Sequence, residues 1–186
     1  MGIPTLIKTL TASNDASLSF VDGSASVVLD STYDEYMFVY TDVNPATDNV
    51  HFQFQVNATD DAGGGYDTSL ITSSFFEAIH QESGGATALQ YVSGADLANS
   101  ASFQRISESI GNGSDESCAG ILHLFSPAST TYVKHFYSRG QTYYQDNRAV
   151  DEFCAGYIND TTAIDEIQFK MSSGNFDGVI QLYGIS

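Results

Sequence analysis

The segment 164–186, IDEIQFKMSSGNFDGVIQLYGIS, decides the fold that this sequence predicts. Two runs with strand-like alternation flank the short turn SSGN, so the segment is expected to form a β-hairpin. In the second run, Ile180 and Leu182 point to one face of the strand, whereas Val179, Tyr183 and Ile185 point largely to the other. Both faces are apolar. One face is therefore expected to join the core, together with Phe176, and the other needs a second layer or a neighbouring subunit. The chain ends after this run, which predicts that the last strand completes a sheet.

Period-two patterns recur along most of the chain. In VHFQFQVN (50–57), large apolar side chains alternate with polar ones, which predicts a half-buried strand. YDEYMFVYTDV (33–43) is apolar on both faces and predicts a central strand that is covered on both sides. SSFFEAIHQE reads as either a strand or a helical turn or two, and the signal is weak between Gly84 and Asn112. Further strand candidates are IPTLIKTLTAS, ASLSFV, ALQYVSG, SFQRISESI, SCAGILHLF, TYVKHFYS and DEFCAGYIN.

These runs suggest nine to eleven short strands, separated by turn segments such as SPAST, RGQ…QDN and NDTT. Their spacing, about 8–12 residues, is typical of sandwiches and barrels. Neither a long amphipathic helix nor a fixed repeat is visible. The sequence therefore predicts a single all-β domain over residues 1–186, an antiparallel β-sandwich of jelly-roll type.

The net charge of the chain argues against several classes of function. The chain has 186 residues, with 6 Lys and Arg against 23 Asp and Glu, and a net charge of −17. Such a chain repels phosphate backbones and anionic membrane surfaces, so neither nucleic-acid binding nor membrane insertion is expected. No apolar run approaches the length of a membrane span, and no N-terminal signal is expected. Only 16% of the residues are charged, a low value that suits a β protein packed beside copies of itself.

Residues that could carry chemistry are scattered. The histidines His51, His80, His123 and His135 lie far apart in strand-like runs, which argues against a zinc site. Asp60, Asp61 and Asp67 could supply oxygens to a cation, as could Asp115 and Glu116, but polar loops explain both groups and neither spacing matches a standard calcium loop. Cys118 and Cys154 sit in apolar runs and are expected to be buried free thiols. We therefore predict no catalytic residue, no cofactor and no metal.

Sugar binding has somewhat more support, because jelly-roll folds often present aromatic and amide side chains on a concave face. Residues of suitable type are Gln53, Gln55, Tyr143, Tyr144 and Tyr157. Trp, the strongest stacking residue, is absent, and Tyr in strands more often serves sheet packing.

Three stretches carry a family resemblance: LIKTLTASNDASLSFVDG, STYDEYMFVYTDVNPATDNVHFQFQVN and IDEIQFKMSSGNFDGVIQLYGIS. Together they resemble small virion structural proteins of tailed bacteriophages, especially marine ones. The resemblance covers both ends of the chain, about a third of its length, but not the segment from Gly84 to Asn112. It implies a β-sandwich that assembles into multimers, often threefold, and it implies no catalytic residues.

Two functions from different classes follow from these observations. In the first, the chain is a non-enzymatic component of the virion, namely a capsid decoration, head-fibre or tail protein, with copies of itself and other virion proteins as partners. In the second, it is a receptor-binding module of a phage fibre with a host-surface glycan as its ligand. A depolymerase of host polysaccharide is a third and weaker alternative, which would require two facing carboxylates in a groove.

Overall fold

The computed structural model describes residues 2–59, 66 and 69–186, and these residues form an all-β structure without a helix. This confirms the predicted fold class, although the strands outnumber the nine to eleven expected. The strands are β1 (Thr5–Asp15), β2 (Ser17–Val21), β3 (Glu35–Pro45), β4 (Val50–Ala58), β5 (Ile71–Gln81), β6 (Thr87–Tyr91), β7 (Gln104–Ile110), β8 (Cys118–Phe125), β9 (Lys134–Tyr144), β10 (Arg148–Ile158), β11 (Ile164–Met171) and β12 (Phe176–Ile185). Within the described part of the chain, nothing has the length and apolar character of a membrane-spanning helix.

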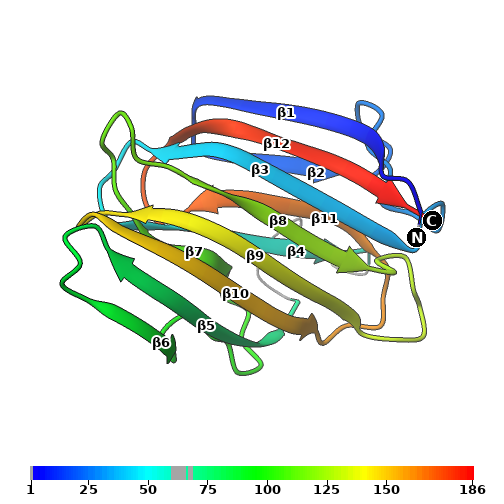
Figure 1. Cartoon of the computed structure of the whole chain (residues 1–186). Helices are drawn as coiled ribbons and strands as arrows, with labels where there is room; N and C mark the ends of the chain where they lie inside the picture. Colours follow the sequence, from blue (N-terminus) through cyan, green and yellow to red (C-terminus); the bar gives the residue numbers. More distant parts are fainter. Residues whose placement is uncertain (1, 60–65, 67–68) are drawn as a thin grey trace.

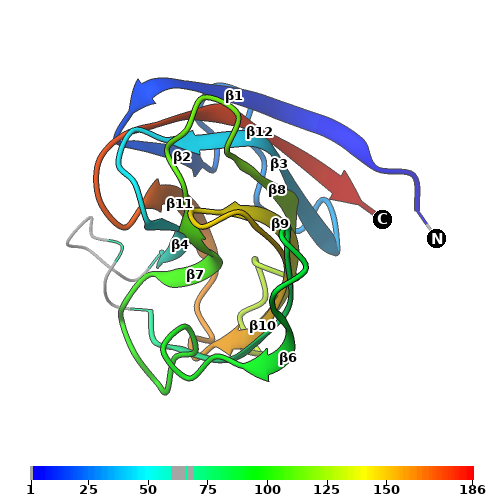
Figure 2. The same ribbon diagram turned by 60° about the vertical axis from the view of Figure 1, so that its left-hand side comes forward.

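The strands form two layers, and every pairing between them is antiparallel. The larger sheet has the order β1-β12-β3-β8-β9-β10-β5-β6 and faces the viewer in Figure 1. The smaller sheet has the order β2-β11-β4-β7 and lies behind it, as the turned view of Figure 2 shows. The two sheets meet along one side, where Ile110 of β7 pairs with Tyr144 of β9.

The winding is that of a jelly roll. When β5, β6, β9 and β10 are set aside, the remaining strands pair as nested partners: β1 with β12, β2 with β11, β3 with β8, and β4 with β7. This nesting is the pattern of a long hairpin wrapped into two sheets. The two extra strand pairs, β5–β6 and β9–β10, are both added to the larger sheet beyond β8. The predicted jelly-roll architecture is therefore confirmed, and the four extra strands widen the larger sheet.

Aromatic rings fill the space between the sheets. Phe169 of β11 lies at the centre, with ring centroids 5.4 to 6.3 Å from those of Phe20, Phe38, Phe52 and Phe54. These rings come from both layers and are fully buried. Burial of each such side chain contributes about 1.5–3 kcal/mol, so this cluster is a main source of stability. The alternation in β4 had predicted the burial of Phe52 and Phe54.

The prediction of a β-hairpin over residues 164–186 is wrong, because β11 pairs with β2 and β4 in the smaller sheet, whereas β12 pairs with β1 and β3 in the larger one. The turn SSGN therefore connects the two layers. The closing strand itself contributes to the core, as its alternation predicted. β12 lies between β1 and β3, and Phe176, Ile180 and Leu182 are buried in the core. Val179, Tyr183 and Ile185 project from the other face and are half-buried. The described residues of the chain place no second layer over that face.

Two other sequence predictions were wrong in detail. β3 is central, but it is not covered on both sides: Tyr36, Phe38 and Tyr40 are buried, whereas Met37 and Val39 on its other face stay half-buried. The segment RGQ, predicted to be part of a turn, lies inside β9 and pairs with β8 and β10. A Cβ atom on Gly140 would lie 2.6 Å from the hydroxyl oxygen of Tyr40. This glycine therefore permits close packing within a strand and does not mark a turn.

The weakly patterned middle of the chain contains regular structure. SSFFEAIHQE forms strand β5, in which Phe75 and Ile79 point into the core and Phe76 points out. SFQRISESI includes β7, the last strand of the smaller sheet, in which Ile106 and Ile110 are buried. The segment between β6 and β7 runs along the edge of β5, where the carbonyl of Leu97 accepts the backbone N–H of Ser73 at 2.9 Å.

Candidate functional site: the outer face of the larger sheet

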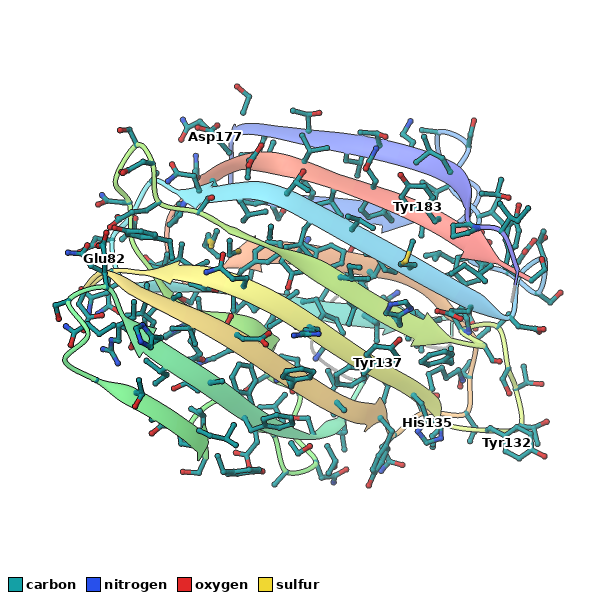
Figure 3. The ribbon with its side chains drawn as sticks, viewed as in Figure 1. Glu82, Tyr132, His135, Tyr137, Asp177 and Tyr183 are labelled. Carbon is teal, nitrogen blue, oxygen red and sulfur yellow. The ribbon has the colours of Figure 1, made fainter. Side chains whose placement is uncertain are left out.

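The side of the larger sheet that points away from the core carries a continuous band of large side chains, which we call the outer face. Directly paired residues line up across six strands, from β3 to β6. This first row consists of Val39, Ile121, Arg139, Phe153, Phe76 and Tyr91. A second row, two residues further along the strands, consists of Tyr183, Met37, His123, Tyr137, Ala155 and Ser74. Figure 3 shows Tyr137 and Tyr183 projecting from this face.

Exposed apolar side chains concentrate on the outer face. Among the described residues, eight large hydrophobic side chains are exposed, and five of them belong to strands of the larger sheet: Leu6, Phe76, Leu89, Tyr91 and Tyr137. Leu89 is 76% exposed and Tyr91 57%. Scattered apolar residues are normal on a protein surface, whereas a contiguous apolar patch is typical of an interaction surface. The outer face is therefore the candidate functional surface.

Ring stacking and one ion pair make the centre of this face rigid. The rings of Phe76 and Phe153 stack in parallel with centroids 4.9 Å apart. The guanidinium of Arg139 lies 4.8 Å from the Phe153 ring centroid and donates two hydrogen bonds to Asp151, at 2.8 and 3.1 Å. Such planar side chains lose little conformational freedom when they are covered, which favours binding.

A second cluster lies beside the first. The imidazole of His123 stacks on Tyr137, with centroids 4.5 Å apart, and its Nδ1 makes a short contact with the carboxylate of Glu35. Phe125 completes the group, with its ring centroid 5.8 Å from that of Tyr137. Between the two clusters, the sheet surface is hollowed over about 580 Å³, with a lining that includes Ala119, Ile121, Tyr137, Arg139 and Gln141.

The outer face is poor in charge on a strongly acidic molecule. The two central rows contain no carboxylate, although the chain has 23 acidic residues. The carboxylates beside these rows, Glu35 and Asp151, are bound to His123 and Arg139 respectively. The face therefore lacks the excess of negative charge that covers the rest of the chain.

The structure does not gather the residues suggested for sugar binding. Gln53 and Gln55 lie on β4 of the smaller sheet, and Tyr143, Tyr144 and Tyr157 lie on the larger one. The amide of Gln55 is buried and donates to the carbonyls of Ala101 and Ser102 at 3.1 and 3.2 Å, so its role is structural. The Tyr144 ring is covered by the guanidinium of Arg148, 4.3 Å from its centroid.

Candidate metal ligands are also separate. In the described part of the chain, no three His, Cys, Asp or Glu side chains come together in a way that could hold a metal ion. Glu116 accepts the backbone N–H of Gly113 at 2.6 Å, as expected of a polar turn. Asp60, Asp61 and Asp67 lie outside the described residues.

His51 is a structural residue. Its Nδ1 accepts the backbone N–H of Ser109 at 3.1 Å, and the carboxylate of Glu108 lies 3.4 Å from the same nitrogen. Because Nδ1 is an acceptor, the contact with Glu108 is not an ion pair. Burial, with a smaller contribution from the charge of Arg105, lowers the pKa of His51 to about 4, so the ring is neutral at pH 7.

Cys118 and Cys154 are both buried free thiols, and burial raises the pKa of each above its ordinary value. They lie on β8 and β10, which flank β9, so about 9 Å or more separates their backbones, too far for a disulfide. We expect the native protein to resist thiol reagents and to keep its mobility on reduction. The same protein in guanidinium chloride should label at two sites, and a 118–154 bridge found by mass spectrometry would refute the assignment.

Sequence reasoning did not single out Phe76, Arg139 or Phe153. The sequence did contain one indication of this surface, because SSFFEAIHQE has apolar residues on both faces of the strand. Phe75 and Ile79 lie on one face, and Phe76 and Ala78 lie on the other. The chain matches no protein-family model and no curated protein.

Proposed function

We propose that the chain is a non-enzymatic structural protein of a bacteriophage virion that works as a homo-oligomer, as a capsid decoration, head-fibre or tail component. The proposal joins the sequence resemblance to the observed surface. The resembling stretches include β1–β2, β3–β4 and β11–β12, which supply six of the eight nested jelly-roll strands. Jelly rolls are frequent among capsid and lectin domains, but that analogy alone assigns no function.

The outer face is the observation that carries the proposal. A large aromatic surface with few charges is costly to leave in water and suits burial against protein. The outer-face hollow is open and lined mainly by apolar atoms, which suits a protein partner. A more polar hollow of about 420 Å³ lies elsewhere, beside Gln53, Ser102 and Arg105. Copies of the chain and other virion proteins are the proposed partners, and the resemblance favours a trimer.

Two measurements test this proposal. Sedimentation of the purified protein is expected to show an oligomer. Antibodies raised against it are expected to label particles of the phage that encodes the chain in immunogold electron microscopy. Label found only outside particles would overturn the virion assignment, whatever the oligomeric state.

A glycan-binding fibre module remains the alternative, because the hollow brings Tyr137, Gln141 and the Arg139–Asp151 pair to one place. A glycan array probed with the intact protein would favour this alternative if binding were lost on Tyr137→Ala. Its weakness is that Arg139 and Asp151 bind each other, and the Gln141 amide donates to the carbonyl of Thr142 at 2.9 Å.

A further inference from the structure

We infer that the outer face binds the outer face of a second copy of this chain, around a two-fold axis that runs along β10. The inference rests on the self-association in the proposed function and assigns it one surface and one geometry, a two-fold pair in place of the trimer that the resemblance favours. Three observations carry it: the distribution of charge, the size of the face and the complementarity of its two halves.

Charge favours a second copy as the occupant. Two molecules that each carry a net charge of −17 repel each other, and they can approach closely only where the acidic side chains are absent or bound. The two central rows of the outer face contain no carboxylate, and Asp151 beside them is held by Arg139. A strongly basic partner would find little negative charge to bind here. In an identical pair, Asp151 on β10 would lie near the partner's Asp151, and each of these carboxylates is hydrogen-bonded to the Arg139 of its own chain, which reduces their repulsion.

The size of the face is sufficient for a stable pair. The six strands β3, β8, β9, β10, β5 and β6 span about 24 Å at ~4.8 Å per strand, and an eleven-residue strand such as β9 spans about 34 Å. The face therefore offers up to about 800 Å², which matches the area that each partner buries in a standard interface.

The two halves of the face complement each other. On one side of β10 lie the exposed side chains of Phe76, Leu89 and Tyr91, on β5 and β6. On the other side lies the hollow over β8 and β9. A two-fold axis along β10 places the exposed side chains of each copy over the hollow of the other, because a residue on one side of the axis meets the opposite side of its partner.

The centre of such a pair would be β10 itself, where residues meet their own copies. Phe153 would face the partner's Phe153, and the exposed Ala155 would lie close to the partner's Ala155. Arg139 lies one strand from β10 on one side and Phe76 one strand away on the other, so each guanidinium would come over the Phe76 ring of the other copy. That contact would add a cation–π interaction to the one already made with Phe153.

Ala155→Glu is the direct test, because it places two carboxylates against each other at the axis and changes no buried residue. Like charges in contact across an interface cost several kcal/mol, so self-association is expected to weaken about a hundredfold or more. Ala46→Glu, at an exposed position in the β3–β4 turn, adds the same charge away from the face and is expected to leave association unchanged. Sedimentation velocity at a series of concentrations measures both.

Cross-linking gives an independent readout that needs no loss of function. Ala155→Cys is expected to yield a covalent dimer with a short bismaleimide, whereas Ala46→Cys and the wild type, whose thiols are buried, are not. Equal association of Ala155→Glu and wild type, or the absence of a cross-linked dimer from Ala155→Cys, would overturn the inference. A trimer that these substitutions do not affect would overturn this inference but not the proposed virion function. A dimer disrupted by Ala155→Glu, together with absence of antibody label on phage particles, would support this inference and overturn the virion function.

Discussion

Deletion of Gly178–Ser186 is expected to abolish folding. The deletion removes Ile180 and Leu182, both fully buried, and each such side chain is worth roughly 2–5 kcal/mol when it is truncated in a core. It also removes the strand that joins β1 to β3, so the backbone hydrogen bonds of both neighbours are lost. The total stability of a domain is only about 5–15 kcal/mol, which the combined loss equals or exceeds. Circular dichroism and thermal unfolding of the truncated chain would measure this.

Single substitutions on the same strand provide the matched control. Leu182→Ala should lower the free energy of unfolding by about 2–5 kcal/mol. Val179→Ala, on the half-buried outer face of β12, should cost clearly less. A truncated chain that still unfolds cooperatively with a native β spectrum would show that β12 is dispensable, against the position that the structure gives it.

The sequence was sufficient to predict the strands whose two faces differ. In β4, Phe52 and Phe54 lie in the core because apolar and polar residues alternate without interruption. The two faces of the closing strand were also predicted correctly, since Phe176, Ile180 and Leu182 are buried, whereas Val179 and Tyr183 are only half-buried. Local alternation determines these faces, and the jelly-roll winding only confirms them.

The parts that sequence reasoning missed depend on contacts between distant segments. Arg139–Gln141 looked like a turn because it contains Gly140, but that glycine exists to accommodate Tyr40 from another strand. Gln55 stands at a polar position of β4, yet it is buried because the carbonyls of residues 101 and 102 cover it. The outer face is itself a product of pairing order, since Arg139, Phe153 and Phe76 meet only when β9, β10 and β5 become neighbours.

A second large effect is expected from pH, through the buried carboxyl of Glu152. This side chain is 1% exposed and points from β10 toward β7, where its Oε1 accepts the backbone N–H of Glu108 at 2.6 Å and its Oε2 is hydrogen-bonded to the hydroxyl of Thr142 at 2.7 Å. Burial raises the pKa of Glu152 well above its ordinary value, and the nearby carboxyls of Glu108 and Glu77 add to the rise, although the two hydrogen bonds oppose it. The folded protein therefore keeps the proton on this carboxyl to a higher pH than the unfolded chain does.

The sign of the pH dependence follows from proton binding. Above pH 4.5, the ordinary pKa of a glutamate, the unfolded chain releases this proton while the folded chain keeps it. The contribution of Glu152 to stability is therefore complete below pH 4.5 and decreases as pH rises toward the folded pKa, by at most about 1.4 kcal/mol per pH unit. Acidic groups with lowered pKa, such as Asp30 and Asp146, act in the opposite direction.

Glu152→Gln isolates this contribution, because glutamine has the same shape, can accept the Glu108 N–H and can donate to Thr142, and does not ionise. The variant is expected to match the wild type within about 1 kcal/mol near pH 4.5 and to become progressively more stable than it as pH rises, by at most about 1.4 kcal/mol per pH unit. Denaturant unfolding at a series of pH values measures the difference, in which the other titrating groups cancel. Glu152→Ala is the contrasting variant, since it leaves the Glu108 N–H and the Thr142 hydroxyl without this partner and should be destabilised at every pH. Stability curves for wild type and Glu152→Gln that stay parallel from pH 5 to pH 9 would mean that Glu152 is ionised in the folded protein, contrary to its burial among other carboxyls.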